Sequence, residues 1–153
     1  GQSQRIERIR MSLDMAEQRH EIPDHILLYG PPGTGKTTIA KLVSPEHNYL
    51  VCHGQEDSYE FNQMFLTNKR KVIILDEIHM LKSGNKTTLY SILEDFQLTW
   101  SIHTRSLLPF TLIGTTTELN KLPDPLLQRF AIIERINFYT DDLTNIFISS
   151  EAS

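Results

Sequence analysis

The stretch YGPPGTGKTTIA, residues 29–40, sets the interpretation of the whole chain. It places two prolines and three glycines between an apolar run and a helical pattern. Glycine lets the backbone turn its N–H groups inward where a Cβ would collide, and proline restricts the turn before a ligand binds. Lys36 and Thr37 follow at the start of the helix, whose positive end attracts anions. The stretch therefore predicts a phosphate-binding turn between a strand and a helix.

The same residues fit the pattern G-x-x-x-x-G-K-[ST] of the P-loop, whose backbone N–H groups surround the phosphates of a nucleotide. In this motif the lysine reaches the β- and γ-phosphates and the hydroxyl binds Mg²⁺, so we expect ATP and Mg²⁺ as ligands. An ordinary Gly-Pro turn is the alternative, but it would not explain the flanking strand and helix. The predicted nucleotide-binding residues here are Gly30, Gly33, Thr34, Gly35, Lys36 and Thr37.

A second motif, residues 72–77, follows further along the chain. Its four apolar residues Val-Ile-Ile-Leu predict a strand buried on both faces, and Asp76 and Glu77 come directly after it. Ligands of open α/β sheets bind at the carboxyl ends of the strands. We therefore expect Asp76 to hold Mg²⁺ through water, and Glu77 to activate an attacking water as general base. A solvated acidic turn is the alternative interpretation.

Three further positions carry hypotheses. Residues 110–117 predict a buried strand that ends in hydroxyls, where a side chain could sense the γ-phosphate or simply finish the strand. Arg129 precedes the last strand and could reach a neighbouring subunit as an arginine finger, or form a surface salt bridge. His79 has no second His or Cys nearby, so we interpret it as a packing residue or a contact sensitive to the nucleotide state, not as a metal ligand.

The remaining pattern alternates strands with helices. Helical periodicity is present at 3–19, 37–43, 60–66 and 86–96, and strand patterns at 26–29, 49–52, 72–75, 110–114 and 132–138. This order predicts an α/β fold with a five-stranded parallel sheet and helices on both faces. We expect one domain over 1–153, without internal repeats or an obvious linker.

Composition excludes several classes of protein. The 153 residues carry a formal net charge of −4, so the chain is not a bulk cation that coats nucleic acid. The apolar runs are far shorter than the roughly 18 residues that span a membrane, and the first twenty residues are too polar for a secretory signal. A single cysteine allows no internal disulfide, which predicts a reducing, cytoplasmic location.

Taken in order, five motifs resemble the AAA+ ATPases, and within them most closely the RuvB family of Holliday-junction branch-migration motors. The motifs are GPPGTGKTT (30–38), LDEIH (75–79), LEDFQL (93–98), PFTLIGTTT (109–117) and LLQRF (126–130). The P-loop and the Asp-Glu pair are shared by all AAA+ proteins, whereas the DEIH, EDF and PFTLIG stretches indicate the RuvB family in particular. The resemblance implies Mg²⁺-dependent ATP hydrolysis that drives remodelling of branched DNA by a homo-oligomeric ring, expected as a hexamer.

The resemblance also implies roles for single residues. Thr38 joins the phosphate contacts, Thr117 matches sensor 1, and Arg129 matches the arginine finger. Glu94, Asp95 and Phe96 match a family stretch at the nucleotide site between subunits, and Tyr139 matches a tyrosine near the bound nucleotide. Plain helix-end and strand-end structure is the alternative for these last four.

The chain departs from the family in several places. We expect it to be truncated at both ends, with residues 140–153 forming the start of the absent lid domain or a tail. Leu127 stands where the family often has a second arginine. The connection from Phe96 to Pro109 is short and leaves only an abbreviated hairpin at 100–105, which argues against a RuvA-like partner.

Three other functions are compatible with these motifs. A clamp-loader-like AAA+ subunit would respond to a sliding clamp, and a protein-remodelling AAA+ ATPase would ignore every DNA structure. A nucleotide-binding module would bind ATP without turnover. We expect no membrane partner.

Overall fold

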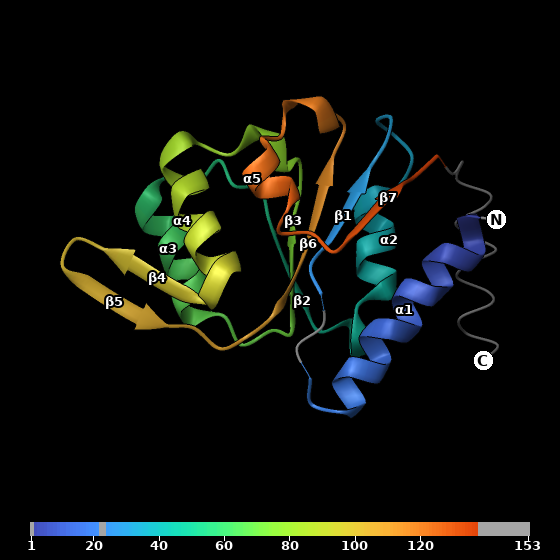
Figure 1. Cartoon of the computed structure of the whole chain (residues 1–153), viewed down its shortest axis with the longest axis horizontal. Helices are drawn as coiled ribbons and strands as arrows, with labels where there is room; N and C mark the ends of the chain where they lie inside the picture. Colours follow the sequence, from blue (N-terminus) through green and yellow to red (C-terminus); the bar gives the residue numbers. More distant parts are fainter. Residues whose placement is uncertain (1, 22–23, 138–153) are drawn as a thin grey trace.

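The computed structural model describes residues 2–21 and 24–137, and a parallel sheet of five strands forms its centre (Figure 1). The strands lie in the order β2-β3-β6-β1-β7, and all four pairings are parallel. The predicted α/β architecture is therefore confirmed. The strands are β1 (Ile26–Tyr29), β2 (Tyr49–Cys52), β3 (Val72–Leu75), β6 (Thr111–Thr116) and β7 (Ile132–Arg135).

Helices cover both faces of this sheet, with α1 and α2 on one side and α3 and α4 on the other (Figure 1). Within the described residues, no helix is both long and apolar enough to cross a lipid bilayer. The α-helices are α1 (Gln2–Gln18), α2 (Lys36–Val43), α3 (Ser58–Thr67), α4 (Ser83–Asp95) and α5 (Asp124–Leu127). Three short 3-10 helices are η1 (Pro45–His47), η2 (Ile78–Met80) and η3 (Leu119–Lys121).

Side chains alternate between the two faces of the strands and build one core on each side. In β1, Leu27 packs with residues of α3 and α4, whereas Ile26 and Leu28 pack with residues of α1 and α2. All three are almost fully buried. Burial of one such side chain stabilises the fold by about 1.5–3 kcal/mol. The continuous apolar strands of the sequence follow from this two-sided burial.

Element ends differ from prediction in a few places. Strand β6 continues two residues beyond the predicted end, because Thr115 and Thr116 pair with Leu28 and Tyr29 of β1. Helix α4 begins at Ser83, three residues before the predicted start, and α5 was not predicted. Strand β7 ends at Arg135, and the predicted continuation beyond residue 137 lies outside the described residues, as does the predicted tail at 140–153.

The expected short hairpin is present as β4 (Gln97–Trp100) and β5 (His103–Ser106), an antiparallel pair separate from the main sheet. It projects from the α4 side of the molecule (Figure 1). Ile102, in its two-residue turn, is 90% exposed. The hairpin therefore presents an apolar tip to solvent.

Gly30 is a position where the backbone excludes any side chain. Its φ is +153°, and a Cβ there would collide with the backbone carbonyl oxygen of Ile136. We expect Gly30→Ala to lower the free energy of unfolding by about 2–4 kcal/mol, which reduces the thermal midpoint by roughly 5–10 °C. Gly84→Ala is the matched control, because a Cβ there has no neighbour within 4 Å and its helical backbone favours alanine. Equal midpoints for the two variants would contradict this prediction.

His25, just before β1, is expected to make folding sensitive to acid. Its Nδ1 accepts a hydrogen bond of 2.9 Å from the backbone N–H of Leu112, and burial lowers its pKa from 6.5 to about 4. Between these values the unfolded chain binds more protons than the folded chain, so stability falls as the pH drops from 6.5 towards 4. The loss amounts to about 3 kcal/mol.

Denaturant unfolding at pH 7.5 and pH 4.5 measures this loss. His25→Asn keeps an acceptor without titrating, so this variant should lose about 2–3 kcal/mol less than the unsubstituted chain over that interval, which ends just above the folded pKa. His103→Asn, at an exposed position of the hairpin, should behave like the unsubstituted chain. The same pH dependence in all three proteins would contradict the role of His25.

Candidate nucleotide-binding site

The P-loop joins the carboxyl end of β1 to the N-terminus of α2, as its sequence predicted. Gly33 and Gly35 have φ values of +78° and +80°, a left-handed conformation that other residues rarely adopt. Gly35 is the N-cap of α2, and its carbonyl accepts the first helical hydrogen bond, from Ile39. The free N–H groups of the first helical turn therefore lie beside the loop, in the arrangement that favours anions.

Lys36 is buried with its ammonium folded onto the loop. Lys36 is only 6% exposed, and its Nζ donates to the carbonyl oxygens of Gly30 at 3.0 Å and Pro31 at 2.8 Å. Burial lowers the pKa of Lys36, while the nearby carboxylates of Glu77 and Asp76 act in the opposite direction. The ammonium thus fixes the loop and places a positive charge within it.

Asp76, directly after β3, accepts two short hydrogen bonds on the same oxygen. The hydroxyls of Thr37 and Thr115 both donate to Oδ1 at 2.6 Å. Burial by itself raises the pKa of Asp76, but these two hydrogen bonds and the charges of His53 and Lys36 outweigh it and lower the pKa. An ionised carboxylate beside a hydroxyl is the oxygen donor set that Mg²⁺ prefers, so the residues fit the expected metal.

Glu77 follows with a strained backbone and a partly exposed carboxylate. Its φ of 50° and ψ of 56° lie in the left-handed region, which is uncommon for a non-glycine residue. The backbone N–H donates to Thr115 Oγ1 at 3.2 Å, and Thr117 Oγ1 donates to Oε2 at 3.1 Å. Glu77 thereby lines the same cavity as residues of the P-loop.

These groups border one cavity of about 210 Å³, and three loops contribute to it. Gly30 and Thr34 do not line it but hold the loop, since both lie within hydrogen-bond distance of Lys36 Nζ. The cavity thus combines backbone donors, a cation, an acidic pair and a hydroxyl from separate parts of the chain. Its lining residues are Pro32, Gly33, Gly35, Lys36, Thr37, Thr38, Asp76, Glu77 and Thr117.

Other predicted site residues lie elsewhere. Arg129 does not line the cavity, and its Nη2 lies 3.6 Å from Oε2 of Glu94 in a solvent-exposed ion pair. Asp95 accepts a hydrogen bond from the backbone of Gln97 at the end of α4. Phe96 packs against the rings of His25 and Phe110, which precede their strands and thus lie at the opposite end of the sheet.

The ring of Phe96 packs against the core and does not line the cavity of its own chain. A contact with a neighbouring subunit stays a prediction for Glu94, Asp95 and Phe96. Arg129 stays a prediction as an arginine finger. Tyr139 lies outside the described residues.

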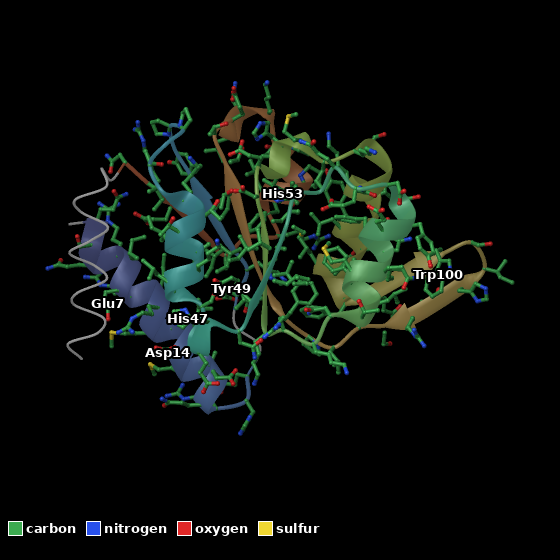
Figure 2. The ribbon with its side chains drawn as sticks, turned by 180° about the vertical axis from the view of Figure 1, so that it is seen from behind. Glu7, Asp14, His47, Tyr49, His53 and Trp100 are labelled. Carbon is green, nitrogen blue, oxygen red and sulfur yellow. The ribbon has the colours of Figure 1, made fainter. Side chains whose placement is uncertain are left out.

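Three polar residues at the site had no specific role in the sequence interpretation. Thr115 and Thr116 contact Asp76 and His79, and His53 Nδ1 lies 4.0 Å from Oδ2 of Asp76. Figure 2 shows His53 at the edge of the sheet where the strands end, far from Trp100 on the hairpin. Its position just after β2 could have identified it, since polar residues that follow parallel strands meet at one edge.

Comparison with known proteins gives consistent matches. A family model for the Holliday junction DNA helicase RuvB P-loop domain matches residues 1–136. The chain is 36% identical over 168 residues to the Holliday junction branch migration complex subunit RuvB of Koribacter versatilis, covering 99% of the chain and 46% of that protein. For RuvB of Ehrlichia ruminantium, the identity is 40% over 160 residues, with 95% and 48% covered.

A solved structure agrees with these matches. The Thermotoga maritima RuvB Holliday junction branch migration motor superposes with a TM-score of 0.77 at 37% identity, over 95% of this chain and 49% of the other. The chain spans about half the length of the curated relatives it matches.

Proposed function

The chain belongs to the family of RuvB P-loop domains, and from this membership we propose that it binds and hydrolyses Mg-ATP as part of a motor that remodels branched DNA. The observation that carries the proposal is the convergence of Lys36, Thr37, Asp76, Glu77 and Thr117 on one cavity. Each supplies a chemical property that phosphoryl transfer requires.

Each of these residues has a separate role in the proposed hydrolysis of ATP. The P-loop N–H groups and Lys36 bind the phosphates, and Thr37 and Asp76 would hold Mg²⁺, which neutralises charge on the phosphate oxygens when bound. Glu77 accepts a proton from the attacking water, while a bond forms from the water oxygen to the γ-phosphorus and the bond to the leaving ADP oxygen breaks. Thr117 contacts Glu77 and lines the same cavity, and it would respond to the γ-phosphate.

The partners follow from the same membership as proposals. The relatives are subunits of a Holliday junction branch migration complex, so we propose branched DNA as substrate and a homo-oligomeric ring, in the form of a hexamer, as the active assembly. The hairpin has strands of only four residues each, which argues against the contact expected with a RuvA-like protein. A cytoplasmic location is part of the same proposal.

ATP turnover in the presence of different DNA structures tests this function. ATP turnover should rise when a four-way junction is added. It should rise less with linear duplex DNA of equal length at the same salt concentration. Stimulation by a sliding clamp but not by a junction would favour the clamp-loader function instead. Turnover that ignores all DNA would favour protein remodelling, and nucleotide binding without turnover would identify a binding module.

Arg129 provides a test of assembly. We expect Arg129→Ala to lower ATP turnover at least 100-fold while leaving nucleotide affinity within about twofold, because an arginine finger acts on the phosphate of a neighbouring subunit. Arg70→Ala is the matched control, since Arg70 is exposed and lies before β3, at the opposite edge of the sheet.

Mixing Arg129→Ala subunits with Lys36→Ala subunits sharpens the test. A Lys36→Ala subunit still carries Arg129, and an Arg129→Ala subunit still carries a complete P-loop. Where the two are neighbours, one active site is complete, so turnover should reappear in the mixture. Unchanged turnover in Arg129→Ala alone would show that this arginine makes only its surface ion pair with Glu94.

A further inference from the structure

His79 is almost completely buried beside Glu77. Its side chain is 7% exposed, and it lies on η2, the short helix that directly follows Glu77. The ring atom Nδ1 lies 2.8 Å from Oγ1 of Thr116 and 3.5 Å from Oε2 of Glu77. The buried imidazole thus lies beside the predicted general base.

The surroundings of Nδ1 determine which tautomer of the ring is favoured. Thr116 Oγ1 already accepts a hydrogen bond of 3.0 Å from the backbone N–H of Glu118 and has a second lone pair for another donor. An Nδ1 lone pair would face the carboxylate charge of Glu77 at 3.5 Å, whereas an Nδ1–H group would be attracted to it. Thr116 Oγ1 can serve either tautomer, as donor to a lone pair or as acceptor from N–H, so it is the Glu77 carboxylate that favours Nδ1–H.

Consecutive threonines at the end of β6 contact all three polar residues of the β3–η2 turn. Thr115 donates to Asp76, Thr116 contacts His79, and Thr117 donates to Glu77. Thr117 and His79 thus both approach the same carboxylate oxygen of Glu77. His79 is itself held to β6 through Thr116, and neither of these two residues lines the cavity.

We propose that His79 is a positioning residue that holds the Glu77 carboxylate in its active direction when Thr117 turns to the γ-phosphate. The proposal rests on the function proposed above, in which Thr117 responds to ATP and Glu77 accepts the proton of the attacking water. When Thr117 leaves Oε2, the Nδ1–H group of His79 is the donor that stays beside the same oxygen.

Steady-state ATP turnover of matched variants tests the role. His79→Leu fills the buried volume without a donor and should lower kcat about 10- to 100-fold, with KM within about twofold, because a misdirected base impairs only the chemical step. His79→Asn retains an N–H donor close to the position of Nδ1 and should recover most of the loss. Equal losses in both variants would overturn the proposal, as would unchanged turnover in His79→Leu.

Substitution of Thr116 tests the role of His79 independently. Thr116→Val removes the anchor of His79 and should reproduce the loss in kcat, whereas Thr116→Ser keeps the hydroxyl and should not. The double variant His79→Leu with Thr116→Val should lose little more than either single variant, because both act through one contact. Fully additive losses would overturn the proposal.

An NMR measurement of the His79 tautomer tests the contact between His79 and Glu77 without an assay of ATP turnover. Long-range ¹H–¹⁵N correlation spectra of the labelled chain report the tautomer of each histidine, and loss of a signal in His79→Asn assigns it. We expect the Nδ1–H tautomer at neutral pH, and a predominant Nε2–H form would overturn the proposal. Normal turnover in Glu77→Gln would instead contradict the proposed function, so the two failures are distinguishable.

Discussion

Replacement of Glu77 by glutamine is expected to reduce ATP turnover by about 100- to 10,000-fold without weakening nucleotide binding. General base catalysis contributes about this factor, and an amide cannot accept the proton of the attacking water. The amide oxygen can still accept the hydrogen bond of 3.1 Å from Thr117, so the surrounding turn should be preserved. Removal of one negative charge beside the phosphates also reduces repulsion of ATP.

Two measurements on each variant check this expectation. Affinity for a fluorescent ATP analogue should stay the same or increase, while release of inorganic phosphate should fall to the stated level. Glu60→Gln is the matched control, because it makes the same chemical change at an exposed position on α3. Phosphate release near the normal rate in Glu77→Gln would exclude Glu77 as the base.

Replacement of Lys36 by alanine is expected to remove the stabilisation of the fold by Mg-ATP. A ligand at about 100 times its dissociation constant raises the free energy of unfolding by roughly 2.7 kcal/mol. For a domain of this size, that corresponds to a rise of roughly 5–10 °C in the thermal midpoint. The variant lacks the one buried cation of the P-loop, so bound phosphates would lose their strongest electrostatic partner.

Thermal unfolding with and without excess Mg-ATP measures this effect. The comparison uses the shift in midpoint, because Lys36 also donates to the loop carbonyls of Gly30 and Pro31 and its loss can change the baseline stability. Lys41→Ala, in the last turn of the same helix, should keep the full shift. An equal shift in Lys36→Ala would place nucleotide binding outside the P-loop.

Local patterns of the sequence were sufficient to predict the fold and to place the P-loop and the acidic pair at the same edge of the sheet. The P-loop occupies eight consecutive positions between a strand and a helix, and its glycines are required by their own backbone angles. Asp76 follows four apolar residues, so the rule that ligands bind at the ends of parallel strands was sufficient to place it. The resemblance to RuvB is confirmed over residues 1–136.

The sequence was thus sufficient to predict the fold, the family and the elements that carry the candidate site. The contacts themselves became known only from the structure: which hydroxyl contacts which acid, that His79 lies against Glu77, and that the ring of Phe96 packs against Phe110. Apart from that between His79 and Glu77, these contacts join residues far apart in the chain, and they depend on the register of β6 against β3 and on the left-handed backbone at Glu77. Neither is encoded in a short motif, because both result from the packing of the whole sheet.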